Sequence, residues 1–498
     1  MTRRLIALPV LIALLFVSGA ASSKRPTPPK SFVHHLRPTA EIESRSLPPI
    51  DLAARRAQDE RLRDEPAPFR VAYAIPLRAS PQDAGTWEEI PGVGSVWRLR
   101  VDSPGAIFMS FKFADFELPD GAELHFVSVG RDYHDGAYTE RHNRPPRRFG
   151  SPMVPGDSAV IELFLPEGSE PASLELESVS HGFRNVMGMG AFAPRGGPPA
   201  AASESLAVHT SALAAGPFSC QRDIGCEEGA PYQDVKRAAA EGYDGQYICS
   251  GQLINNSRQD NRYLYITAEH CEWWIDPPTM AYYWNYENST CGSNDAPLRF
   301  STGSTDLYHS AAADLDLLEL DGTDLEGLYD IYFVGWNRGG DTPASAATIG
   351  FPSDKPKQIS IRNDPVIDCA AGGCTNGWGP NYWRIDLYDV GVPEGGSSGG
   401  MLLDQNNLLV GTLTGGVGTN CNNFEWDEYA KIAPQWASLQ PFLDPDATGR
   451  VWLPGKDHAD VPGVPLFSAW GTALYAALLL IAGSFAIWLG RTARPTRE

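Results

Sequence analysis

Residues 394–400 have the sequence Glu-Gly-Gly-Ser-Ser-Gly-Gly, which places Ser398 among residues with no side chain or a very small one. Such a loop leaves backbone N–H groups free, and an acyl-transfer enzyme needs two of them to stabilise the oxyanion of its tetrahedral intermediate. We predict that Ser398 is a nucleophile and that the N–H groups of Gly396 and Ser398 form an oxyanion hole. Gly- and Ser-rich turns are common, so this loop alone does not identify the fold. The residues that precede and follow it are needed to choose between folds.

The order of the residues along the chain separates two folds that use such a serine. The loop also fits the Gly-x-Ser-x-Gly elbow of α/β-hydrolases, in which an acid and then a histidine follow the serine. After Ser398 the chain has one histidine, His458, just before an apolar C-terminal segment. The α/β-hydrolase fold therefore does not fit, whereas His270 and Asp314 upstream give the order His, Asp, Ser of a chymotrypsin-like protease.

Both upstream residues lie at the ends of predicted strands. The apolar run 263–269 leads into His270, and Asp314 begins the sequence Asp-Leu-Asp-Leu-Leu-Glu-Leu. Asp316 competes for the same role, because side chains two residues apart on a strand share a face. We choose Asp314, since Asp-x-x-Leu-Leu-x-Leu is the usual presentation of the triad acid in this fold. The predicted catalytic triad is thus His270, Asp314 and Ser398.

The length and composition favour an all-β protein with more than one domain. The chain has 498 residues, 42% of them apolar, with 49 Gly and 41 Pro. A single core rarely exceeds about 250–300 residues, and many turn residues favour short strands. The net charge of −21 repels a phosphate backbone, which argues against nucleic acid as a partner.

The two ends of the chain carry targeting signals. Residues 1–21 combine two arginines, an apolar run and small residues, which indicates a secretory signal peptide. Residues 466–490 contain no charged residue and are followed by a basic tail, 491–498, which predicts a transmembrane helix with its end in the cytoplasm. The preceding Pro-containing segment also resembles bacterial C-terminal sorting tails of the IPTL type, so that a sorting protease is a second expected partner. The protein is expected to be exported, and to be extracellular, periplasmic or held at the cell surface.

The expected organisation between these ends follows Pro, Gly and the strand patterns. Runs such as 95–101, 107–113, 123–129 and 159–165 alternate or cluster apolar residues between turns, which favours a β-sandwich. The predicted segments are an extended or disordered stretch (22–68), a β-rich propeptide domain (69–184), an exposed linker (185–216), a trypsin-like double β-barrel protease domain (217–455) and a spacer (456–465).

All eight cysteines lie between residues 220 and 421, behind the predicted signal peptide. An oxidising compartment favours four disulfides over a metal site, and the spacings do not match a zinc pattern. Eight cysteines allow 105 pairings, so composition leaves the connectivity open.

Several longer motifs make a family resemblance specific. They are Cys249-Ser-Gly-Gln-Leu-Ile-Asn-Asn, Thr267-Ala-Glu-His-Cys, Tyr283-Trp-Asn-Tyr-Glu-Asn-Ser-Thr-Cys, Leu317-Leu-Glu-Leu and Gly391-Val-Pro-Glu-Gly-Gly-Ser-Ser-Gly. Together they resemble bacterial lysyl endopeptidases over roughly residues 220–450. The resemblance implies a serine endopeptidase that cuts protein or peptide substrates after lysine, through an acyl-enzyme and without a metal or organic cofactor, and whose N-terminal region is a propeptide.

The resemblance also implies three disulfides, Cys220–Cys421, Cys226–Cys291 and Cys249–Cys271. Cys369 and Cys374 remain and would close a tight loop. The segment 426–429 resembles the part of the family that carries the specificity acid, so Asp427 is the candidate floor of the substrate pocket, with Thr414, Gly415 and Gly416 on the adjacent substrate-binding strand. The family has a histidine where this chain has Thr414, so Lys should be favoured with less exclusion of Arg.

A rival interpretation is a catalytically silent, membrane-tethered binding or adhesion protein built on a protease scaffold. The complete triad argues against it. Labelling by an organofluorophosphate distinguishes the two, because a binding module has no activated serine.

Overall fold

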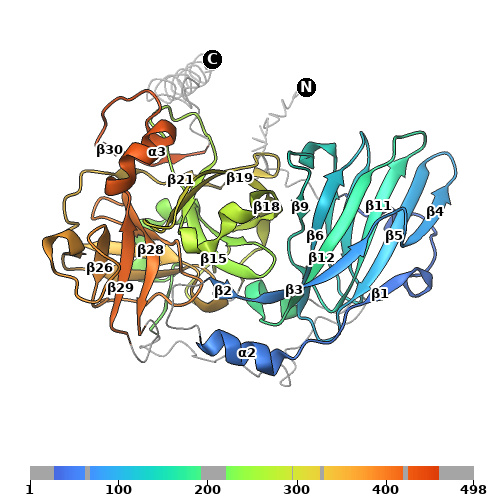
Figure 1. The fold of residues 1–498 in the computed structure, drawn as a ribbon, viewed down its shortest axis with the longest axis horizontal. Helices are drawn as coiled ribbons and strands as arrows, with labels where there is room; N and C mark the ends of the chain where they lie inside the picture. Colours follow the sequence, from blue (N-terminus) through green and yellow to red (C-terminus); the bar gives the residue numbers. More distant parts are fainter. Residues whose placement is uncertain are drawn as a thin grey trace, which may run out of the picture.

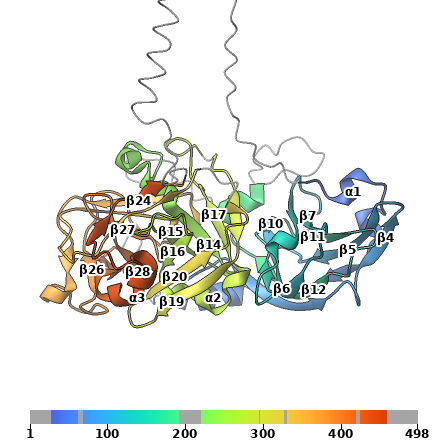
Figure 2. The same ribbon diagram turned by 90° about the horizontal axis from the view of Figure 1, so that it is seen from above.

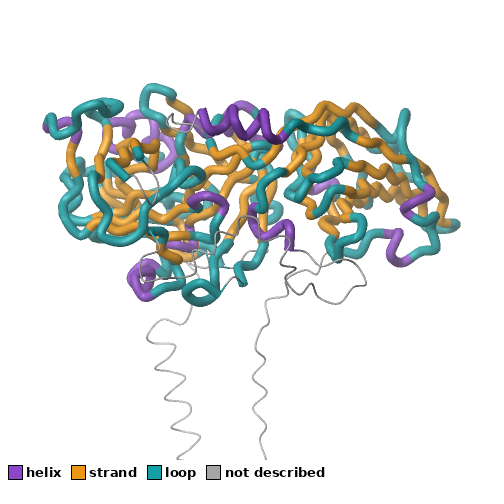
Figure 3. The backbone as a smooth tube through the Cα atoms, turned by 90° about the horizontal axis from the view of Figure 1, so that it is seen from below, coloured by secondary structure: helices purple, strands orange, loops and turns teal. Residues whose placement is uncertain are grey.

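The computed structural model describes residues 27–61, 68–191, 220–293, 295–325, 330–418 and 424–458. Strands dominate these residues, and helices are few and short (Figure 3). The N-terminal sheets lie at one end of the molecule and the C-terminal sheets at the other (Figures 1 and 2). The all-β prediction is confirmed at this level.

The described part of the N-terminal half forms two sheets that share one core. The first has the order β1-β5-β11-β7-β8 with β4 on β5, and the second has the order β10-β6-β12-β3 with β9 on β6. Phe111 of the second sheet stacks on Phe126 of the first, with ring centroids 5.3 Å apart. The strands are β1 (Ser44–Ser46), β3 (Ala72–Ala79), β4 (Thr86–Ile90), β5 (Gly94–Asp102), β6 (Phe108–Glu117), β7 (Glu123–Ser128), β8 (His134–Tyr138), β9 (Phe149–Gly150), β10 (Val154–Pro155), β11 (Ser158–Pro166) and β12 (Ser173–Gly182).

Residues 27–61 are folded against these sheets. Helix α1 (Lys30–Val33) and helix α2 (Leu52–Arg61) flank β1, which pairs in parallel with β5. Leu47, just after β1, is buried in the shared core. This differs from the extended or disordered segment expected for 22–68, because β1 and Leu47 find partners in β5 and the sandwich core.

The C-terminal half contains two further sheets. One has the order β18-β17-β14-β15-β16-β20-β19 and the other the order β13-β24-β23-β27-β28-β29-β26-β25. Ile266 and Leu317 of the first sheet share a core with Ile349 and Met401 of the second. The first comprises β14 (Ala239–Tyr243), β15 (Tyr247–Leu253), β16 (Leu264–Thr267), β17 (Ala281–Trp284), β18 (Arg299–Thr302), β19 (Ser304–Ser310) and β20 (Leu315–Leu320).

The second comprises β13 (Arg222–Asp223), β23 (Ala346–Gly350), β24 (Gln358–Arg362), β25 (Ile367–Asp368), β26 (Tyr382–Ile385), β27 (Met401–Leu403), β28 (Leu409–Val417) and β29 (Trp426–Lys431), with β22 (Trp336–Asn337) and β30 (Trp452–Leu453) at its side. Helix α3 (Trp436–Leu443) follows β29.

The structure differs from the sequence prediction at the start of the linker and at the start of the spacer. Val186 and Met189, inside the expected linker, are buried in the core of the C-terminal half, so the described chain stays packed to residue 191. Strand β31 (Lys456–Asp457) pairs with β21 (Tyr332–Phe333), so the expected spacer begins as part of the folded protein.

The predicted signal peptide (1–21), most of the linker (192–216), the apolar segment (466–490) and the basic tail (491–498) lie outside the described residues. Among the residues that the structure does describe, we find no helix with the length and apolar character to cross a membrane.

The N-terminal sheets contact the C-terminal half through hydrogen bonds and through an apolar cluster that includes Phe108 and Tyr243. The guanidinium of Arg148 donates two hydrogen bonds of 2.9 Å to the carboxylate of Asp276. The backbone N–H of Met153 donates to the Tyr283 hydroxyl at 2.8 Å. Strand β2 (Phe69–Arg70) leaves the N-terminal half altogether and pairs with β15 (Figure 1).

Candidate active site

His270 follows the end of β16, within a single helical turn at Glu269–Cys271. Its ring nitrogen Nδ1 lies 2.9 and 3.0 Å from the two carboxylate oxygens of Asp314. Its backbone N–H donates to Asp314 Oδ1 at 2.9 Å. The Cys249–Cys271 disulfide ties the next residue to β15, so the histidine is fixed from both sides.

Asp314 stands immediately before β20 with φ +48°, a left-handed conformation that turns its carboxylate toward His270. Its side chain is buried. Burial alone would raise the pKa of the Asp314 carboxyl, but the charge and hydrogen bonds of His270 hold this pKa below its ordinary value. The carboxylate is therefore ionised and stabilises the Nδ1–H tautomer of His270.

Nε2 of His270 is buried and makes no hydrogen bond with any residue in the described ranges. Because Nδ1 faces Asp314, Nε2 is the ring nitrogen left to accept a proton. Asp316, the competing acid, lies beside β16 at the register position of Thr267. Burial and the negative charges of Asp306 and Glu269 raise its pKa well above the ordinary value, which disfavours Asp316 as the triad carboxylate.

The Ser398 loop packs against the strands that carry the histidine. The backbone N–H of Ser250 donates to the Ser398 carbonyl at 2.8 Å, and the Ser250 hydroxyl donates to the Gly396 carbonyl at 2.8 Å. At Gly399, with φ +79°, a β-carbon would lie 2.1 Å from Thr267 Oγ1. Only glycine allows the loop to come this close to Thr267, the last residue of the strand that precedes His270.

The N–H groups of Gly396 and Ser398 donate to no other group among the residues that the structure describes. Gly396 has φ +96°, and a β-carbon there would lie 2.6 Å from the Phe351 carbonyl oxygen. This geometry leaves two donors beside the serine, as a developing oxyanion requires.

The structure separates the residues that we grouped as substrate-binding. Thr414 is buried, and its hydroxyl has no hydrogen-bond partner among the described residues. Gly415 and Gly416 continue β28 at the surface. A β-carbon at Gly416 would lie 2.4 Å from Asp427 Oδ1, which places that carboxylate beside Gly416, on the neighbouring strand β29.

Asp427 is fully buried, and its Oδ2 accepts a hydrogen bond of 3.0 Å from the Tyr388 hydroxyl. Its Oδ1 has no hydrogen-bond partner among the described residues, and no described cation pairs with it. Burial raises the pKa of Asp427 to about 7, against the lowering effect of Tyr388. A buried carboxylate with one oxygen that has no hydrogen-bond partner favours binding of a positively charged side chain.

The sequence did not reveal three residues of this region. Tyr388 carries no pattern that links it to Asp427, 39 positions away. Arg384 neutralises the neighbouring acid Glu428 at 2.6 Å in a buried pair, which leaves Asp427 as the acid without a cation. Ser250 was also missed, although the sequence offered a signal for it, since it follows Cys249 in one of the motifs quoted above.

The disulfides Cys226–Cys291, Cys249–Cys271 and Cys369–Cys374 are present. The fourth expected pair, Cys220–Cys421, involves a cysteine outside the described residues. Two clusters have the spacing of metal ligands, Cys249 with His270 and Cys271, and Cys369 with Cys374 and Glu428. In both clusters the sulfurs are joined in a disulfide, so neither offers a thiolate ligand.

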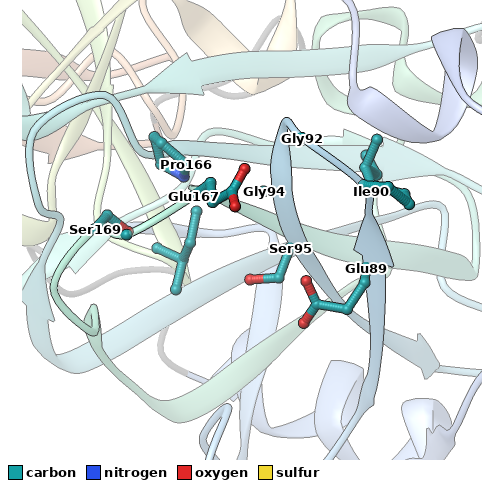
Figure 4. Close-up of a pocket in the computed structure, with 11 residues that line it drawn as sticks. Glu89, Ile90, Gly92, Gly94, Ser95, Pro166, Glu167 and Ser169 are labelled. Carbon is teal, nitrogen blue, oxygen red and sulfur yellow. The ribbon is translucent and has the colours of Figure 1, made fainter.

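A pocket in the N-terminal half is separate from these residues. It lies between the β4–β5 turn and the segment after β11, and Glu89 and Glu167 line it (Figure 4). None of the candidate catalytic residues contributes to it.

Comparisons with known proteins match both halves of the chain. The family model described as "Lysyl endopeptidase N-terminal domain" matches residues 46–183, and "Lysyl endopeptidase, C-terminal domain" matches residues 216–430. The chain is 27% identical over 380 residues to the lysyl endopeptidase of Pseudomonas aeruginosa, covering 70% of this chain and 75% of that protein.

Among solved structures, the serine endoprotease of Yersinia pestis matches 44% of this chain and 68% of its own, with 18% identity and a TM-score of 0.29. The sequence matches are the informative ones. Because the N- and C-terminal models of a single family match in chain order, this chain is a lysyl endopeptidase-like serine endopeptidase.

Proposed function

We propose that Ser398, His270 and Asp314 hydrolyse peptide bonds on the carboxyl side of lysine. The observation that carries the lysine preference is the buried Asp427 carboxylate beside Gly416, whose Oδ1 has no hydrogen-bond partner among the described residues. The similar chain from Pseudomonas aeruginosa bears the name lysyl endopeptidase. The two C-terminal sheets would correspond to the two barrels of a chymotrypsin-like protease.

In the proposed reaction the Ser398 hydroxyl attacks the peptide carbonyl while His270 Nε2 takes its proton. The oxyanion then accepts hydrogen bonds from the N–H groups of Gly396 and Ser398. When the C–N bond breaks, His270 returns the proton to the leaving amine, and the acyl group stays on Ser398. Water then attacks the ester with the same histidine as base, which releases the acid and restores the serine.

Asp314 keeps its negative charge throughout this cycle. Its two oxygens hold Nδ1–H and the backbone N–H of His270, which orients the ring and stabilises the imidazolium. Every group required is supplied by the chain itself.

Replacing Asp427 with Asn is expected to lower kcat/KM for a lysyl amide roughly a hundredfold, because losing one partner of a buried charge pair costs about 3 kcal/mol. Three amides that differ only in Lys, Arg or Leu before the scissile bond measure the effect. In the wild type Lys should be best, Arg should be accepted, and Leu should be worst.

Asp386→Asn is the matched control, since Asp386 is exposed on the loop after β26 and should leave all three rates unchanged. Cleavage after Leu as efficient as cleavage after Lys, or an unaltered preference in Asp427→Asn, would show that another residue binds the substrate cation.

The lysine preference should also depend on pH. Because the pKa of Asp427 is raised to about 7, the carboxyl is neutral below that pH and cannot pair with lysine. The ratio of kcat/KM for Lys to that for Leu should rise about tenfold per pH unit below pH 7 and level off above it. His270 affects both substrates alike and cancels in the ratio, and the Asp427→Asn ratio should not vary with pH.

We also propose that the protein is exported and that the N-terminal half is a propeptide. The disulfides fit an oxidising compartment. The propeptide role rests on the family resemblance, in which a separate N-terminal domain precedes the protease domain. Attachment by the C-terminal segment, to a membrane or through a sorting protease, rests on its sequence alone.

A further inference from the structure

Strand β2 of the N-terminal half occupies an edge of the protease sheet. Phe69 pairs with Ile248 and Arg70 with Tyr247, in antiparallel register. The chain then continues along the same edge, where Val71 and Ala72 both donate to the Gln246 carbonyl, at 2.8 and 3.0 Å. Figure 1 shows β2 beside β15, apart from the sheets to which the rest of the N-terminal half belongs.

This edge leads directly to the nucleophile. Ser250, two residues after Ile248, holds the carbonyls of Ser398 and Gly396. The Phe69 ring lies over Gly395, the residue before the oxyanion glycine, and a β-carbon on Gly395 would come within 2.9 Å of it. Phe69 is thus the end of β2 nearer to Ser398, and Val71 lies farther from it.

The direction of β2 matches that of a substrate. The residues that follow a scissile bond run from amino to carboxyl end as they lead away from the nucleophile. Strand β2 runs the same way, from Phe69 beside the Ser398 loop to Ala72 at Gln246. An extended peptide can pair with β15 through the same backbone groups, which is how sheet edges bind peptides.

The N-terminal half also holds β2 in place from its own side. The Arg184 guanidinium lies 4.5 Å from the centre of the Phe69 ring and donates to the Arg70 carbonyl at 2.8 Å. The Arg70 side chain in turn lies over Tyr247 and donates to its hydroxyl at 3.0 Å. Both side chains of β2 therefore have defined positions on the protease.

We propose that β2 lies in the binding site for the substrate residues that follow the scissile bond, so that the N-terminal half blocks that part of the active site. This inference rests on the proposed function. It assigns to the edge 246–248 and Gly395 a preference for an extended peptide with an aromatic residue at the Phe69 position and a cationic residue after it.

Two substrates distinguish blockage of the binding site for residues after the scissile bond from blockage of the whole active site. One is acetyl-lysine p-nitroanilide, which has no residue after the lysine, and the other is a fluorescence-quenched peptide with the same lysine followed by Ala-Phe-Arg-Ala. Initial rates are measured on the full chain, verified as uncut on a gel. The ratio of kcat/KM for the extended peptide to that for the anilide should rise at least tenfold in Phe69→Ala.

Arg184→Ala should raise the same ratio, since it releases β2 without altering the ring on Gly395. Phe32→Ala is the matched control, because Phe32 lies on α1 against His134 in the N-terminal half, and its ratio should stay within twofold of wild type. A ratio within twofold in both Phe69→Ala and Arg184→Ala overturns the inference, as does failure of wild type and both variants to cut either substrate. Anilide hydrolysis that persists in Ser398→Ala would instead count against the proposed function.

Discussion

Replacing Ser398 with Ala is expected to lower kcat for a lysyl amide by about 10⁵- to 10⁶-fold, since removal of a triad nucleophile leaves only binding and oxyanion stabilisation. The loop conformation should survive, because Gly396 and Gly399 carry the unusual φ values and alanine adds no bulk at residue 398. The residual rate is measured with enzyme purified free of host proteases.

Labelling provides a second readout of the same change. An organofluorophosphate should modify wild-type Ser398 stoichiometrically and leave Ser398→Ala unlabelled. Ser397→Ala is the matched control, since Ser397 is the adjacent buried serine and its loss should leave labelling intact. Equal labelling of wild type and Ser398→Ala would place the nucleophile elsewhere.

Replacing Asp314 with Asn is expected to lower kcat by about 10⁴-fold with little change in KM. The substitution removes the negative charge and puts an NH2 group in place of one acceptor oxygen. That NH2 group can donate to Nδ1, which stabilises the wrong tautomer of the ring. Because the pKa of Asp314 is held below its ordinary value by His270, the wild-type carboxylate stays ionised across the working pH range. Steady-state kinetics on the lysyl amide measure the loss.

Asp316→Asn is a close control for this variant. Asp316 is buried two residues after Asp314, within β20, and its raised pKa favours the neutral form, which an amide of nearly the same shape resembles. We expect kcat within about threefold of wild type. A large loss of activity in Asp316→Asn together with normal activity in Asp314→Asn would show that Asp316 is the triad acid.

The sequence predicted the longer strands, in which apolar residues alternate or cluster along the strand. The runs 95–101 and 159–165 correspond to β5 (Gly94–Asp102) and β11 (Ser158–Pro166). The pairing of His270 with Asp314 followed from residue order, because one sequence of triad residues suits this fold. Both inferences use information that is local or ordered along the chain.

The features that escaped prediction depend on contacts between distant segments. Strand β2 has two residues, too few for a periodic pattern, and its partner lies in the other half of the chain. Tyr388 reaches Asp427 only because β26 and β29 are neighbours in one sheet. The substrate-binding role of Thr414 stays a prediction, since its position on β28 does not by itself reveal whether its side chain contacts the substrate.

The seven residues of strand β15 have several separate roles. Cys249 anchors the histidine turn, Ser250 holds the nucleophile loop, and the outer backbone edge accepts an extended peptide. Redesign of this strand for new substrates would therefore disturb catalysis as well, and laboratory evolution should find few tolerated backbone changes there. The Tyr247 side chain, which faces the peptide and not the loop, is where new selectivity can be introduced at the least cost in rate.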